Sequence, residues 1–145
     1  MQPLKLVALD EEDLAIVSAH VQDAVMKVGD IAWLSAEKRL LLSMNRFAWE
    51  KKARSLFSRA HERRRSVLHF ERVTHVRSTG IDREKGDEVL SLLAARFIAA
   101  EPPAGRIELD FAGGGTLVLE VECIEARLSD LGAAWQAAAQ PRHNL

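Results

Sequence analysis

The chain has 145 residues, of which 48% are hydrophobic and 28% charged, a composition typical of a folded globular domain with its own core. Its single cysteine excludes an intrachain disulfide and fits a reducing compartment. The N-terminal segment lacks the basic and apolar regions of a signal peptide, and no run approaches the roughly 18 apolar residues of a membrane span. We therefore expect a single cytoplasmic domain over residues 1–145 with no membrane association.

The net charge of −1 conceals a strongly basic segment. Residues 50–65 contain seven Lys or Arg against two Glu, so the rest of the chain is net acidic. A near-neutral protein with such a segment can still bind an anionic partner locally.

The N-terminal part of the chain shows a strand pattern followed by a helix pattern. Residues 4–9 have the apolar character of a short strand. Asp10 is a suitable helix N-cap, and the acids that follow it fall in the first turn, where the helix dipole favours negative charge. Apolar residues then recur at helical spacing, at Leu14, Val17, Val21 and Ala24. An amphipathic helix lying on a sheet is predicted after Asp10.

The central part of the chain has the period of a β-sheet. Residues 31–34, 35–38 and 39–47 are read as strand, turn and strand. The basic segment 51–65 fits either a short amphipathic helix or a loop, and both remain open. Residues 66–76 are rich in β-branched and aromatic residues and are predicted to form one strand.

The C-terminal part combines a hairpin pattern with a helix pattern. Residues 89–98 are ambiguous between strand and helix. Residues 106–111 and 116–122 alternate strongly and are predicted as strands. Residues 123–132 are predicted as a helix, with a stripe at Ile124, Leu128 and Leu131 and a stop at Gly132, and the alanine-rich tail extends or caps it.

Short turns between successive strands favour antiparallel pairing. The predicted fold class is therefore α+β: a curved antiparallel sheet or partly open barrel of six to eight strands, with an N-terminal and a C-terminal helix.

Three consecutive glycines, Gly113 to Gly115, suggest a phosphate-binding loop. Such a loop is followed by a lysine and the N-terminus of a helix, whereas here a threonine and a strand follow. Glycine also reaches the positive φ values that a tight hairpin turn requires. The glycines are therefore predicted to form a turn.

One cluster resembles a metal site. His69, Glu71 and His75 would share a face of the strand predicted over residues 66–76. At roughly 3.3 Å per residue, His69 and His75 would lie about 20 Å apart, too far for both to bind one ion. We predict a polar face and no metal or cofactor, although these three residues are the candidate polar lining if the sheet encloses a pocket.

The basic segment is the strongest binding candidate in the sequence. Its cations can neutralise phosphates, and an adjacent aromatic side chain can stack on a base. A solvated face paired with acids and a surface for an acidic protein are the alternatives. The candidate polyanion-binding residues are Trp49, Lys51, Lys52, Arg54, Arg59, Arg63, Arg64 and Arg65.

Four stretches together resemble an uncharacterised bacterial family catalogued as domain of unknown function 2948. They are "LKLVALDEEDLAIVSAHVQDAVMKVGDIAWL", "NRFAWE", "LHFERVTHVRSTGID" and "FAGGGTLVLEVECIEARLSDLG". The resemblance implies a bacterial, cytoplasmic, single-domain protein. It implies no activity, ligand or catalytic residue.

The sequence leaves three functional hypotheses. With no catalytic motif in a chain long enough for a full core, the first is a non-enzymatic binding or assembly module that forms a homo-oligomer through a sheet edge or the C-terminal helix. The second is a nucleic-acid or polyanion-binding protein that uses segment 51–65. The third is a small-ligand binder or enzyme with a pocket inside the curved sheet.

Overall fold

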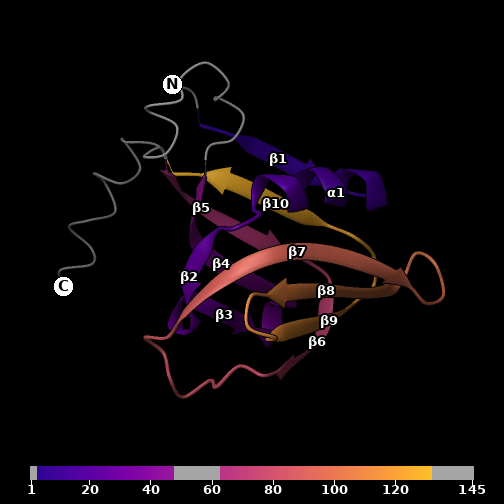
Figure 1. Cartoon of the computed structure of the whole chain (residues 1–145). Helices are drawn as coiled ribbons and strands as arrows, with labels where there is room; N and C mark the ends of the chain where they lie inside the picture. Colours follow the sequence, from indigo (N-terminus) through magenta and orange to yellow (C-terminus); the bar gives the residue numbers. More distant parts are fainter. Residues whose placement is uncertain (1–2, 48–62, 132–145) are drawn as a thin grey trace.

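The computed structural model describes residues 3–47 and 63–131 (Figure 1). Strand β1 (Lys5–Ala8) is followed by the α-helix α1 (Glu11–His20). The next elements are β2 (Val25–Lys27), the 3-10 helix η1 (Val28–Asp30), β3 (Ile31–Leu34), the 3-10 helix η2 (Ser35–Glu37) and β4 (Arg39–Phe47). The remaining strands are β5 (Arg63–Phe70), β6 (Val73–Thr79), β7 (Val89–Ala99), β8 (Gly105–Phe111), β9 (Thr116–Val121) and β10 (Ala126–Asp130).

The ten strands form one antiparallel sheet in the order β1-β10-β5-β4-β2-β7-β8-β9-β6, and β3 pairs with β4 beside β2. The two outermost strands, β1 and β6, do not pair with each other, so the sheet is open. Figure 1 shows the sheet curled over itself, with β7, β8 and β9 in front of β3 and β4. This curvature gives the sheet a concave inner face.

The core lies on the inner face of the sheet. Because successive side chains of a strand point to opposite faces, buried and less buried residues alternate along the strands. In β4, Leu40, Leu42 and Met44 are buried, and the residues between them are only partly buried. The helix α1 packs against β1 and β7 and buries Leu14 and Val17. The Asp10 side chain caps this helix by accepting a hydrogen bond from the Asp13 backbone N–H at 2.8 Å.

An ion pair lies inside the sheet, where β4, β5 and β10 meet. Arg46 is fully buried, and its Nε and Nη2 donate to the two carboxylate oxygens of Asp130 at 2.9 and 2.8 Å. The Asp130 carboxylate also accepts hydrogen bonds from the Ser66 hydroxyl and the Leu4 backbone N–H. Burial acts to raise the pKa of Asp130, but these hydrogen bonds outweigh it and the pKa lies below its ordinary value of 3.8. The ionised carboxylate thus ties three strands to the segment that leads into β1.

The prediction of a curved, open antiparallel sheet is confirmed, but two parts of it are wrong. The described residues alone form ten strands rather than six to eight. The predicted C-terminal helix over residues 123–132 is instead strand β10. Ala126, Leu128 and Asp130 are buried in alternation, and β10 pairs with β1 on one side and β5 on the other. Pairing on both sides outweighed a spacing of apolar residues that also fits a helix.

The single strand predicted over residues 66–76 is also wrong. It is interrupted at Glu71 and Arg72, and Arg72 has a left-handed backbone with φ of 61°. The chain turns there and passes from β5, which pairs with β4 and β10, to β6, which pairs with β9. His69 and His75 therefore belong to different strands.

Other segments were predicted in part. The helix after Asp10 ends at His20, so Val21 and Ala24 continue the buried face beyond it. Residues 89–98, ambiguous in the sequence, lie in strand β7. The question of helix or loop for segment 51–65 falls outside the described residues except at 63–65, which belong to β5. The predicted tail lies outside them as well.

Candidate functional site

The candidate site lies where the curled sheet fails to close, between β3 and β6. Among the described strands, β3 pairs only with β4, and β6 pairs only with β9. Backbone hydrogen bonds join the two sides at both ends of this gap. The Val73 N–H donates to the Lys38 carbonyl at 2.9 Å, and the Gly29 N–H donates to the Gly86 carbonyl at 2.9 Å. We call the gap between these two bonds the seam.

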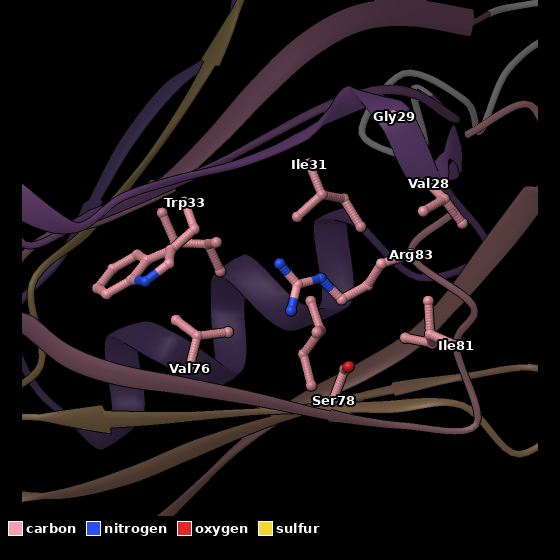
Figure 2. A pocket seen from close by; sticks show the side chains of 10 residues that line it. Val28, Gly29, Ile31, Trp33, Val76, Ser78, Ile81 and Arg83 are labelled. Atoms are coloured by element: carbon pink, nitrogen blue, oxygen red, sulfur yellow. The ribbon is translucent and has the colours of Figure 1, made fainter. Parts of the chain in front are cut away.

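A cavity of about 380 Å³ opens in the seam, within the size range of small-ligand pockets. Ile31 and Trp33 of β3 pair with the buried Leu42 and Leu40, so they belong to the inner face of the sheet. Figure 2 shows the β3 side chains pointing toward Val76 and Ser78 of β6. We call this cavity the seam pocket. The described residues that line it are Val28, Gly29, Ile31, Trp33, Leu40, Val76, Ser78, Ile81, Arg83 and Leu117.

The three glycines have two roles: Gly113 and Gly114 turn the chain, and Gly115 shapes the pocket. Gly113 and Gly114 have φ of 89° and 99° and form the hairpin turn between β8 and β9, as predicted. Gly115 has a different role. A Cβ atom at this position would lie 2.8 Å from Cγ1 of Ile81, which lines the pocket. The missing side chain therefore allows Ile81 to pack against the hairpin.

Among the described residues, Arg83 is the only charged residue of the lining. In Figure 2 its guanidinium lies between the side chains of β3 and those of β6. No hydrogen bond or ion pair from this guanidinium occurs within the part of the chain that the structure describes. Nearby acids have other contacts: Asp82 accepts from the Glu84 backbone N–H at 3.0 Å, and Asp87 lies 4.0 Å from Nζ of Lys27. An arginine that lines a pocket and has no acidic partner among residues 3–47 and 63–131 is available to a ligand.

The sequence candidates His69 and Glu71 meet on the opposite, outer face of the sheet. Nδ1 of His69 lies 2.7 Å from Glu71, and Nε of Arg39 donates to both Glu71 oxygens at 2.9 and 3.1 Å. Partial burial acts to raise the pKa of Glu71, but the hydrogen bonds from His69 and Arg39 prevail and lower it. His75 is exposed on β6 beside Thr74. None of these three candidates lines the seam pocket.

The structure places only part of the basic segment. Arg63, Arg64 and Arg65 are the first three residues of β5, and the Arg63 guanidinium lies 4.6 Å from the centre of the Phe47 ring. Arg65 donates a long hydrogen bond of 3.5 Å to Asn45. The other candidates, Trp49, Lys51, Lys52, Arg54 and Arg59, lie outside the described residues. Polyanion binding by this segment stays a prediction.

The described residues hold neither a cluster of metal ligands nor a membrane-spanning helix. They contain no group of three or more His, Cys, Asp or Glu side chains placed to hold a metal ion. Their helices are too short or too polar to cross a bilayer.

Comparison with known proteins assigns the chain to a protein family. Residues 4–143 match the model of a family described as protein of unknown function (DUF2948). The chain belongs to this family. No curated protein and no solved structure matched it. DUF2948 membership thus confirms the resemblance seen in the sequence.

Sequence reasoning allowed for a pocket inside the curved sheet but missed the residues that line this one, because no local pattern indicates them. Trp33 stands in a short strand, Val76 in a segment read as one long strand, and Arg83 in a polar loop. Only the curvature of the sheet brings them together. The one signal in the sequence is an arginine within an acidic loop, residues 80–88, where a solvated charge is the ordinary interpretation.

Proposed function

We propose that this chain is a non-enzymatic, cytoplasmic binding module that holds a small, mostly apolar ligand in the seam pocket. The observation that carries the proposal is the pocket itself: a cavity of about 380 Å³ at an open seam of the sheet, whose walls combine aliphatic and aromatic side chains with the polar groups of Ser78 and Arg83. The single cysteine supports a reducing compartment.

The pocket gains binding energy from apolar surface that the fold leaves incompletely covered. Ile31, Trp33, Val76 and Ile81 pack against the core but are only partly buried. Covering such surface contributes roughly 25 cal/mol per Å², so 100 Å² contributes about 2.5 kcal/mol. Most of the walls are strands of one hydrogen-bonded sheet, which favours a preformed site, and η1 and the loop of residues 80–88 complete the lining.

The lining supports binding rather than catalysis. Its polar side chains in the described part of the chain are Ser78 and Arg83, with no carboxylate, imidazole or thiol beside them. An acid–base or nucleophilic mechanism requires a base within hydrogen-bonding reach of the reacting group.

A fluorescence titration, which measures binding of the neutral, apolar probe N-phenyl-1-naphthylamine, tests the proposal. We expect the wild-type protein to bind it with a dissociation constant of roughly 1–100 µM. The variant Ser78→Trp fills the pocket from β6 and should lose this binding. The variant His75→Trp places the same side chain on the outer face of the same strand and should bind as the wild type does.

Both variants substitute exposed positions of one strand, so a difference between them reports the pocket and not the stability of β6. Absence of binding by the wild type, or equal binding by Ser78→Trp and His75→Trp, would contradict the proposal.

A further inference from the structure

We propose that the ligand of the seam pocket carries one carboxylate group, which Arg83 binds while the apolar walls hold the rest of the molecule. The inference rests on the proposed function and adds the chemical class of the ligand: a small amphipathic monocarboxylate with a ring or chain body.

The position of Arg83 supports an anionic head group. Its guanidinium lies between Ile31 of β3 and Ser78 of β6 (Figure 2), and the other described residues of the lining carry no charge. A cationic ligand would be repelled by this charge, and a neutral one would leave it without a counter-charge. An anion would replace the water around the guanidinium with charge-assisted hydrogen bonds.

The shape of the donors favours a carboxylate in particular. The planar guanidinium presents parallel N–H donors that match the two oxygens of a carboxylate. The Ser78 hydroxyl lines the same pocket and supplies one more donor. A monoanion is therefore fully matched by one arginine and one hydroxyl.

The surroundings disfavour a doubly charged head group such as a phosphate monoester. No second cation lines the pocket within the described residues. The loop of residues 80–88 that carries Arg83 holds four acids and only two basic residues. A second negative charge on the ligand would meet this acidic loop without a cation to compensate it.

The ligand body is set by the other walls. Trp33 and the aliphatic side chains around it offer a flat ring and branched chains, which suit an aromatic or short alkyl body. The cavity of about 380 Å³ suits a compound of one or two rings or the equivalent chain.

Calorimetric titration with three matched compounds tests the inference: naphthalene-2-carboxylate, the neutral naphthalene-2-carboxamide and 2-naphthyl phosphate. Their bodies are the same, so affinity differences report the head group. For the wild-type protein we expect the carboxylate to bind roughly tenfold more tightly than the amide. We expect the phosphate to bind no more tightly than the carboxylate.

Two variants assign the effect to one side chain. Arg83→Gln should remove the preference for the carboxylate and leave the affinity for the amide within about twofold of the wild type. Lys85→Gln removes a positive charge from the same loop at a residue that does not line the pocket, and should keep the preference.

Equal wild-type affinities for carboxylate and amide, or an unchanged preference in Arg83→Gln, would overturn the inference. A phosphate that binds more tightly than the carboxylate would overturn the assignment of the head group. Binding of N-phenyl-1-naphthylamine is read separately, so its absence refutes the seam pocket as a binding site, whereas its presence without a carboxylate preference refutes only the role of Arg83.

Discussion

Replacing Asp130 with asparagine perturbs the most deeply buried charge pair that the structure describes. Asp130 and Arg46 have side chains 1% and 0% exposed. The variant Asp130→Asn keeps the shape of the side chain but removes the charged acceptor of two Arg46 hydrogen bonds and one from Ser66. The guanidinium then stays buried without that carboxylate, and breaking a buried pair from one side costs about 3–5 kcal/mol.

Urea unfolding measures this cost. With a slope of about 2 kcal/mol per molar urea, a loss of 3–5 kcal/mol lowers the unfolding midpoint by roughly 1.5–2.5 M. The matched control is Glu122→Gln, which removes a carboxylate 2.9 Å from Nζ of Lys38 where both side chains are about half exposed. Water and salt screen an exposed pair, so this variant should hardly move the midpoint.

The pH dependence provides a second measurement of the same pair. Because the pKa of Asp130 is lower in the folded protein than its ordinary value of 3.8, the ionised form stabilises the fold. This stabilisation is complete above the pKa of the unfolded chain and is lost as pH falls through the folded pKa. The difference in stability between wild type and Asp130→Asn should therefore shrink below about pH 3.8. Midpoints of Asp130→Asn and Glu122→Gln that coincide at pH 7 would refute the reasoning.

Three further predictions concern the pocket wall, the outer face and the basic segment. Gly115→Val should displace Ile81 and weaken binding of N-phenyl-1-naphthylamine severalfold, whereas unchanged affinity would show that the wall tolerates a Cβ. Glu71→Gln should lower the free energy of unfolding by about 1 kcal/mol or less at pH 7, and the difference should vanish as pH falls through the lowered pKa of Glu71; a loss that persists at acid pH would contradict this. If the basic segment binds nucleic acid, oligonucleotide affinity measured by anisotropy should fall steeply with salt and be lost in Arg63→Glu/Arg65→Glu, and absence of binding at low salt would remove that alternative.

Local patterns predicted the parts of the fold that depend on local physics. The hairpin of β8 and β9 followed from strict alternation on both sides of a glycine turn, and the start of α1 followed from its cap at Asp10. In these segments, neighbouring residues alone determine the backbone.

Other parts depend on partners distant in the sequence. The segment that contains β10 is predicted as a helix because Ile124, Leu128 and Leu131 recur at helical spacing. A strand forms there because β1 and β5 pair with this segment on its two sides. The break after β5 arises at Arg72, a residue type that gives no turn signal.

The candidate site was the least predictable feature, because it is made by the curvature of the whole sheet. Trp33 and Arg83 come from segments that share no pattern, and their meeting depends on how far β6 curls toward β3. The polar cluster that the sequence did suggest, His69 with Glu71, is real but lies on the outer face, since the alternation along β5 directs Leu68 and Phe70 inward.

The most direct test of the central claim, that the seam pocket binds a ligand, is the indole N–H signal of Trp33 in a two-dimensional ¹H–¹⁵N spectrum, assigned with the variant Trp33→Phe. The protein is titrated with naphthalene-2-carboxylate. We expect the Trp33 signal to shift and saturate with the calorimetric affinity, and to stay in place in Ser78→Trp. Calorimetric binding with an unmoved Trp33 signal, or the same saturating shift in Ser78→Trp, would contradict the claim.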